Sequence, residues 1–126
     1  MILLISLREI NKIAGYRGLR ASAFHGAQRV MQPSYVYMLA SHRNGTLYVG
    51  ATTDLIKRSW EHKNKFIPGF TAKYNVHMLV YYEMHDLYIE AARREKRFKN
   101  WPRQWKLNLI EKLNPEWRDL YEEICQ

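Results

Sequence analysis

The chain has 126 residues, of which 20 are Lys or Arg and 12 are Asp or Glu, so its formal net charge is +8. This length corresponds to one ordinary domain, and 47% hydrophobic with 25% charged residues argues against a disordered chain. The single cysteine, Cys125, excludes an internal disulfide framework and a Cys-rich zinc site, and it fits a reducing compartment. No apolar run approaches the roughly 20 residues that cross a bilayer, so we expect a cytoplasmic protein with no membrane partner.

Residues 1–33 differ from the rest of the chain, because they hold five basic residues, one acidic residue and no sustained apolar period. We expect them to be a poorly ordered N-terminal extension, with Met31 as the natural start. An Arg-rich, Ser-containing and nearly acid-free segment also fits an organelle transit peptide, which stays open as the alternative.

The first patterned elements are two strands and a helix. Residues 35–40 are rich in strand formers, Asn44-Gly45 is a strong turn signal, and residues 46–50 return as a second strand, so a hairpin is predicted. Thr53 or Asp54 can then cap a helix that runs to about residue 64.

The second half of the chain is predicted to hold one strand and three helices. Residues 67–71 contain Pro-Gly and are expected to form a loop, and residues 76–84 have strand composition. Asp86 can cap a helix that ends near Asn100. Two further helices are predicted, one over residues 103–113 and one that follows Pro115, a residue suited to a first helical turn.

The order ββαβααα contains no long parallel crossover, so it predicts an α+β fold with a small three-stranded antiparallel sheet flanked by helices. We expect residues 34–113 to form the domain and residues 114–126 to supply a C-terminal helix that packs on it.

The positive charge is concentrated in the middle of the chain. Residues 57–106 hold twelve basic residues against five acidic ones, a net of +7, whereas residues 107–126 hold two against five. Basic residues interleaved with aromatic ones suit a nucleic acid, although a solvated helix face gives the same pattern. The predicted nucleic-acid contacts are Lys57, Lys63, Lys65, Lys73, Lys96 and Lys99.

Five polar residues are candidates for chemistry. Tyr37 and Tyr48 lie on the two paired strands, where tyrosine is also simply a good strand residue. Arg58 and His62 are four apart and so share one helix face, where a plain surface pair is the alternative. Glu95 falls on the apolar stripe of its helix, which is costly for a carboxylate unless it binds a metal or, alternatively, forms a buried ion pair with an arginine.

These residues carry a resemblance to a known family. Tyr35-Val36-Tyr37 and, ten residues later, Tyr48-Val49-Gly50 resemble the paired triplets that name the GIY-YIG nucleases, with Tyr in place of the first Gly and Val in place of both Ile. Residues 53–62 resemble the helix that carries the family's Arg and His, and residues 90–96 resemble the segment with its metal-binding Glu. The matches cover residues 34–113 and resemble most the small single-domain bacterial members, which are related to the nuclease domain of the excinuclease.

The resemblance implies a DNA endonuclease with Mg²⁺ or Mn²⁺ as cofactor, DNA as partner and a place in DNA repair. It implies that Tyr37 is the general base and that Tyr48 orients the attacking water. A free tyrosine has a pKa near 10, so Arg58 and the metal would have to lower the pKa of Tyr37.

The resemblance also implies the remaining roles. Arg58 would offer a planar fork to the phosphate, and His62 would hold Tyr37 or bridge to the phosphate. Glu95 would be the single metal ligand, which suits Mg²⁺ because this ion keeps several waters. The family's later Asn corresponds to Asn108 or Asn114, and the spacing does not choose between them.

Two other kinds of function stay open. A non-catalytic nucleic-acid-binding module would keep the same fold and basic surface, and metal-dependent nicking of plasmid DNA separates it from a nuclease. A partner-binding domain would use Trp101, Trp105 and Trp117, but their helical spacing favours core positions.

Overall fold

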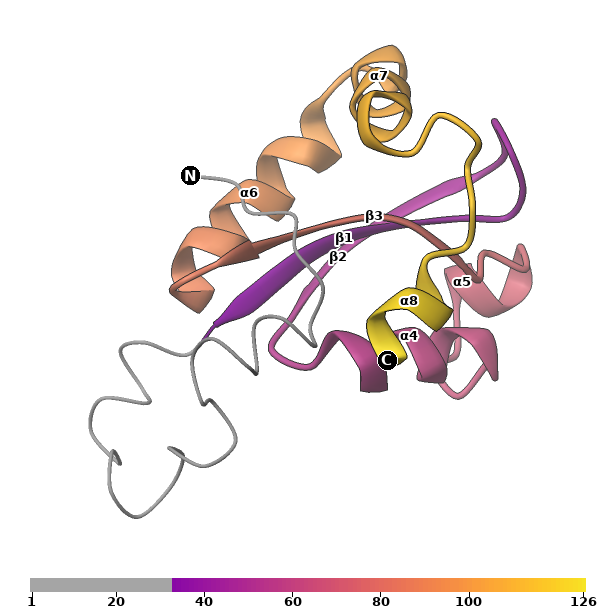
Figure 1. Ribbon diagram of the computed structural model, residues 1–126, viewed down its shortest axis with the longest axis horizontal. Helices are drawn as coiled ribbons and strands as arrows, with labels where there is room; N and C mark the ends of the chain where they lie inside the picture. Colours follow the sequence, from indigo (N-terminus) through magenta and orange to yellow (C-terminus); the bar gives the residue numbers. More distant parts are fainter. Residues whose placement is uncertain (1–32) are drawn as a thin grey trace.

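Residues 33–126 are described by a computed structural model, so the expected extension lies, apart from Pro33, outside the described part (Figure 1). A three-stranded antiparallel sheet with flanking helices confirms the predicted α+β class. The elements are β1 (Ser34–Ala40), β2 (Leu47–Thr52), α4 (Leu55–Lys63), α5 (Phe70–Lys73), β3 (Met78–His85), α6 (Tyr88–Asn100), α7 (Arg103–Leu113) and α8 (Tyr121–Cys125).

The sheet has the order β2-β1-β3, so β1 is central and β2 and β3 are its edges. Helices α6 and α7 cover one face, and α4, α5 and α8 lie on the other (Figure 1). Side chains alternate along β1, with Val36 and Met38 in the cluster under α6 and α7 and Tyr37 and Leu39 in the cluster with α4 and α8. All seven residues of β1 are buried, because both faces are covered.

The predicted hairpin between β1 and β2 is confirmed. The Gly45 N–H donates to the His42 carbonyl over 2.9 Å, and Asn44 takes a positive φ of 59°, which asparagine tolerates better than most residues. Strand β2 continues to Thr52, two residues beyond the prediction.

Glycine is required at position 50 by a side chain on the neighbouring strand. Gly50 pairs with Tyr37 across the sheet, and a Cβ at this position would lie 2.4 Å from the Tyr37 hydroxyl oxygen. The Tyr37 side chain therefore passes over β2, an edge strand, and its hydroxyl comes to the open side of the sheet.

Helix α4 begins as predicted, with Asp54 as its cap. The Asp54 carboxylate accepts from the Lys57 N–H over 3.1 Å, and Asn64 ends the helix. Its buried face carries Leu55, Ser59 and His62, so His62 points inward against the sheet.

The predicted loop at residues 67–71 is wrong in its second half. Gly69 takes a φ of 110°, which glycine adopts freely, and the short helix α5 starts directly after it. Asp86 is not a cap either, because α6 begins at Tyr88 and Leu87, its first flanking residue, provides no side-chain hydrogen bond.

A helix that follows Pro115 is also wrong, because Asn114 stabilises a turn there instead. The Asn114 side chain accepts from the Arg118 N–H over 3.0 Å and donates to the Arg118 carbonyl over 2.9 Å. It takes the backbone groups that a helix would use, so α8 begins only at Tyr121.

The segment before α8 is attached to the sheet. The Leu120 N–H donates to the Leu79 carbonyl over 2.7 Å, Asp119 pairs with Lys63, and Ile124 of α8 is 1% exposed. Of the three tryptophans expected in the core, Trp117 is buried, but Trp105 is 55% exposed, which contradicts the core position.

The described part of the chain, residues 33–126, contains no helix with the length and apolar character needed to span a bilayer.

Candidate active site

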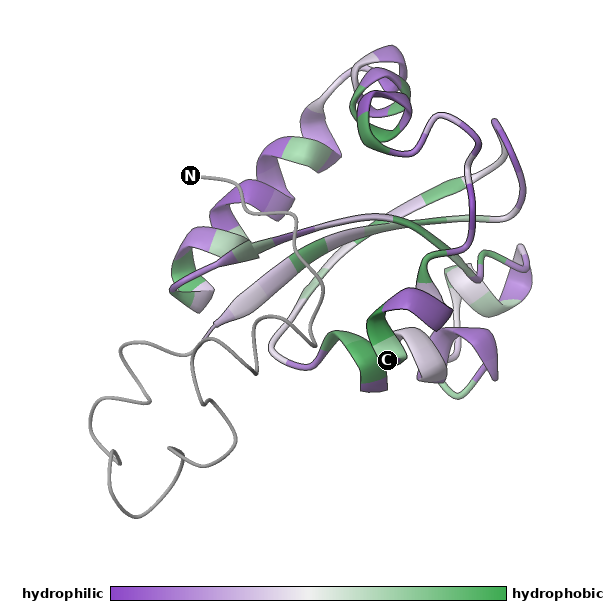
Figure 2. Cartoon of the chain, viewed as in Figure 1, coloured by the Kyte–Doolittle hydropathy of each residue, from purple (hydrophilic) through white to green (hydrophobic). Residues whose placement is uncertain are grey.

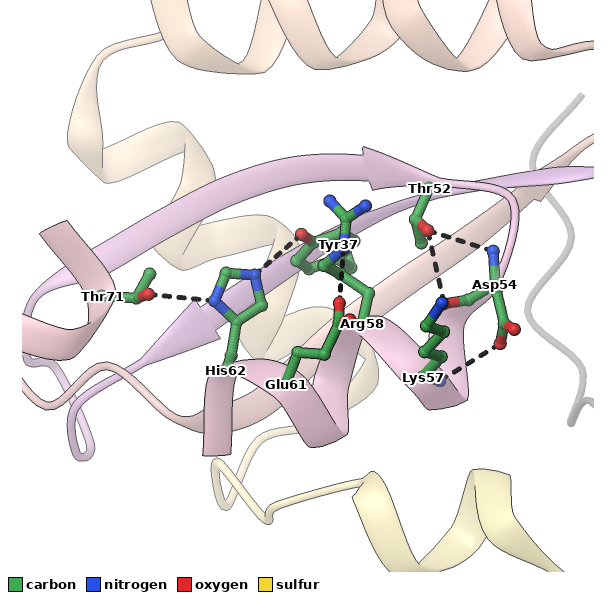
Figure 3. Close-up of polar contacts among 8 residues, drawn as sticks. All are labelled: Tyr37, Thr52, Asp54, Lys57, Arg58, Glu61, His62 and Thr71. Carbon is green, nitrogen blue, oxygen red and sulfur yellow. Dashed lines mark hydrogen bonds and ion pairs between the residues drawn. The ribbon is translucent and has the colours of Figure 1, made fainter. Parts of the chain in front are cut away.

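Three buried side chains from three elements form a continuous line of polar contacts (Figure 3). The Tyr37 hydroxyl of β1 lies 3.1 Å from His62 Nε2 of α4, and His62 Nδ1 lies 3.0 Å from Thr71 Oγ1 of α5. Their exposed fractions are 0%, 2% and 4%, so each polar atom depends on the others for a partner.

Tyr48 lies beside this line on the same face of the sheet. Its ring centroid is 6.3 Å from that of Tyr37 and 5.2 Å from that of His62. On its other side Tyr48 stacks on Phe70 of α5 at 6.4 Å, and Phe70 contacts Tyr74 at 4.9 Å. A row of rings therefore leads from the buried site to the surface, where Phe70 and Tyr74 are each about half exposed.

Arg58 is the cation of the site. It lies one turn before His62 on α4, its side chain is 41% exposed, and its Nε is 3.2 Å from the Glu61 carboxylate. Its guanidinium interacts with the Tyr37 hydroxyl on one side and with Glu61 on the other (Figure 3). Arg58 thus connects the buried tyrosine with the solvent.

A hollow of about 300 Å³ opens next to Arg58 at the start of α4. A substrate that occupies it could touch Arg58 from outside while Tyr37 stays covered. Its lining consists of Thr52, Thr53, Asp54, Lys57, Arg58 and Glu61.

Burial sets the protonation of the site. It raises the pKa of the Tyr37 hydroxyl, and Tyr48 adds to the rise, whereas Arg58 opposes it. Burial also lowers the pKa of His62 to about 4, with Arg58 in support and Glu61 in opposition. Both side chains are therefore neutral at pH 7, and Arg58 alone does not lower the pKa of Tyr37 as the sequence analysis required.

Glu95 comes to the site from the opposite layer. Its helix, α6, packs against β2 and β1, and its carboxylate contributes to the raised pKa of Tyr37, so the charge acts on this hydroxyl. The side chain is 22% exposed and pairs with Lys99 over 2.9 Å. The alternative of a buried ion pair with an arginine is therefore wrong for Glu95.

The two candidate asparagines lie elsewhere. Asn114 is buried, and besides the turn at Arg118 its side chain donates to the Val80 carbonyl over 3.1 Å, so its polar atoms serve the fold. Asn108 is exposed on α7 and accepts from Gln104 over 2.9 Å.

The six predicted lysine contacts divide by their partners. Lys63 is half-buried and pairs with Asp119, so it holds the C-terminal segment, contrary to the prediction of a nucleic-acid contact. Lys73 lies over the ring of Tyr74 at 5.4 Å, next to the row of aromatic rings. Those exposed on the surface are Lys57, Lys65, Lys73, Lys96 and Lys99.

The sequence analysis missed three features of the site region. Thr71 had no signal, because a lone threonine in a loop is common, and the exposure of Phe70 could not be read from its type. Glu83 is fully buried on β3, where it accepts from Tyr81 over 2.5 Å and from Arg94 over 2.9 Å. A glutamate within a strand-forming run was the available signal for such a network.

Comparison with known proteins agrees with the geometry. The GIY-YIG catalytic domain matches residues 33–108. A UPF0213 protein of Staphylococcus saprophyticus is 38% identical over 80 residues, which are 64% of this chain and 96% of that protein. A UPF0213 protein of Bacillus pumilus is 35% identical over 82 residues, 65% of this chain and 83% of that protein. Comparison with solved structures finds no match. Since the domain match covers more than half of the chain and includes every residue around Tyr37, the protein belongs to the GIY-YIG family.

Proposed function

We propose that this protein is a divalent-metal-dependent endonuclease that hydrolyses phosphodiester bonds in nucleic acid, with DNA as the foremost substrate. The observation that carries the proposal is the buried Tyr37 hydroxyl held between His62 and Arg58 at an open sheet edge. A tyrosine that served only the strand would need neither a histidine acceptor nor an adjacent guanidinium.

The neutral pair of Tyr37 and His62 supports a proton relay. As the water oxygen attacks phosphorus, a water proton passes to Tyr37 and the tyrosine's own proton passes to His62 Nε2. The bond from phosphorus to the leaving oxygen breaks, and that oxygen takes a proton from solvent. Tyr37 never has to persist as a tyrosinate, which its raised pKa disfavours.

Arg58 and Tyr48 have supporting roles in this proposal. The half-exposed guanidinium of Arg58 binds phosphate oxygens by a bidentate contact, which requires it to release Glu61. A bound phosphate also brings negative charge near His62, which raises its capacity to accept a proton. Tyr48 borders the same space and orients the attacking water.

The residues present fit a hydrated Mg²⁺ or Mn²⁺ better than a fully protein-bound ion. Within residues 33–126 no group of three or more His, Cys, Asp or Glu gathers as a cage. Glu95 offers one partly exposed carboxylate, and Mg²⁺ is usually held by one or two carboxylates, waters and substrate phosphate. Glu95 would hold the ion after it releases Lys99, and the ion would neutralise charge that develops on the phosphate.

Nicking of supercoiled plasmid tests the proposal. The protein should nick with Mg²⁺ or Mn²⁺ and not with chelator, and Tyr37→Phe should reduce the rate about 100-fold or more while plasmid affinity and thermal stability stay the same. Plasmid binding without metal-dependent nicking would support the non-catalytic binding module and overturn the proposed activity.

A further inference from the structure

The line from Tyr37 through His62 to Thr71 leaves its hydrogen atoms to be assigned. A neutral imidazole carries one N–H and one lone pair, so it donates at one nitrogen and accepts at the other. Both neighbours of His62 are hydroxyl groups that can donate or accept. Two directions of the line are therefore chemically available.

The surroundings of Tyr37 select one direction. Its hydroxyl keeps its proton, which needs an acceptor because the side chain is fully buried. Arg58, the other polar group beside it, offers donors only. The acceptor is therefore Nε2 of His62, at 3.1 Å, and the ring proton must be on Nδ1.

The Nδ1–H of His62 then needs an acceptor of its own, and Thr71 Oγ1 lies 3.0 Å from it. We propose that Thr71 is a positioning residue, whose hydroxyl holds His62 in the Nδ1–H tautomer with the Nε2 lone pair directed at Tyr37. It acts through His62 and touches no reacting atom.

The backbone around α5 keeps this hydroxyl in place. The Thr71 carbonyl accepts from the Val76 N–H over 2.9 Å, and the Lys73 N–H donates to the Gly69 carbonyl over 2.9 Å. Threonine is branched at Cβ, so its side chain has few rotamers to leave the contact. The hydroxyl is thus presented to His62 before any substrate binds.

The consequence for cleavage rests on the proposed function. In the Nδ1–H tautomer His62 can take the proton of Tyr37, whereas in the Nε2–H tautomer two protons would face each other and the relay would be blocked. Outer partners that fix a catalytic or metal-bound histidine typically account for 10-fold to 100-fold in activity.

The test compares Thr71→Val, which keeps the shape and removes the hydroxyl, with Thr71→Ser, which keeps the hydroxyl. Nitrogen-15 NMR of the His62 ring reports the tautomer without any need for activity. The wild type and Thr71→Ser should show Nδ1–H, and Thr71→Val should show the Nε2–H form in part or in full. Thr46→Val, a hydroxyl lost near the β1–β2 turn, is the matched control and should leave the His62 signals unchanged.

The rates give a second readout. With metal, Thr71→Val should lower kcat about 10-fold to 100-fold with little change in KM, and Thr71→Ser should restore most of it. An Nε2–H ring in the wild type overturns the proposal, as does a Thr71→Val protein that keeps the wild-type tautomer. A wild type with the Nδ1–H ring but no nuclease activity would refute the proposed function alone.

Discussion

Two glutamates on neighbouring elements differ in what their carboxylates contact. Glu83 is 0% exposed, and its oxygens accept from Tyr81, His85 and Arg94, so its charge is used up inside the protein. Glu95 is partly exposed and has the flexible Lys99 as its ion-pair partner. The buried pair with an arginine that the sequence suggested for Glu95 is present, but at Glu83.

Glu95→Gln should separate a metal-binding role from a structural one. The change keeps the side-chain shape and removes the charge that attracts Mg²⁺, so nicking should fall by orders of magnitude. The free energy of unfolding should change by less than about 1 kcal/mol, because the pair with Lys99 is near the surface. Plasmid nicking and urea denaturation measure the two effects.

Glu83→Gln is the matched control for this prediction. It leaves Arg94 in contact with a neutral partner inside the protein and should cost about 3 kcal/mol of stability. If Glu95→Gln instead unfolds the protein while cleavage per folded molecule persists, the metal must be bound elsewhere.

His62 makes stability depend on pH in a defined window. Its pKa is lowered from 6.5 to about 4 in the folded protein, so the unfolded chain binds more protons between these values. Stability should therefore be full above about pH 6.5 and should fall as the pH drops toward 4, by up to about 3 kcal/mol from this group. In His62→Gln, which cannot titrate, the difference in unfolding free energy between pH 7 and pH 4.5 should be smaller. An equal pH dependence in both proteins would contradict the neutral, buried imidazole.

At the scale of elements, local signals predicted what is locally determined. The three strands, the Asn44-Gly45 turn and the Asp54 cap follow from composition and from hydrogen bonds within four residues. The errors lie where a distant or side-chain partner decides. Asn114 replaces helix hydrogen bonds beyond Pro115, and α5 follows a glycine with positive φ.

The same distinction holds for the candidate site. Tyr37, Tyr48, Arg58 and His62 could be found because they lie at motif spacing on two elements, and the structure brings them together. Thr71 could not be found, because its role depends on how α5 packs against α4 and not on its neighbours in sequence.

Helix α5 should add binding energy through its exposed rings. Phe70 and Tyr74 continue the aromatic row from Tyr48 to the surface, and a base that stacks on an aromatic ring gains about 1–3 kcal/mol. Phe70→Ala should therefore weaken nucleic-acid binding about tenfold without change in the thermal transition. Trp105→Ala, an exposed ring on the opposite layer, is the control and should bind as the wild type does. Equal affinity of all three proteins in fluorescence anisotropy would exclude base stacking on α5.

At the scale of the whole molecule, positive charge lies on both layers around the sheet edge. Figure 2 shows that α6 is mostly hydrophilic on its surface, and the basic residues of this helix include Arg93, Lys96, Arg97 and Lys99. On the other layer α4 exposes Lys57 and part of Arg58. A polyanion that reaches Tyr37 therefore meets cations from both sides, while the acidic C-terminal segment lies apart in sequence and uses Asp119 to hold Lys63.

This distribution predicts binding that depends strongly on salt and weakly on sequence. Lysine and arginine release counterions from the phosphates, so the logarithm of the binding constant should fall linearly with that of the salt concentration, and unrelated duplexes should give similar slopes. Arg58→Ala should weaken binding modestly and flatten the slope by about one contact, because one phosphate partner is lost. Lys112→Ala, an exposed cation in the acidic C-terminal part of the chain, should leave the slope unchanged. A salt-independent affinity, or an equal loss of slope in both variants, would show that phosphate contacts near Tyr37 do not govern binding.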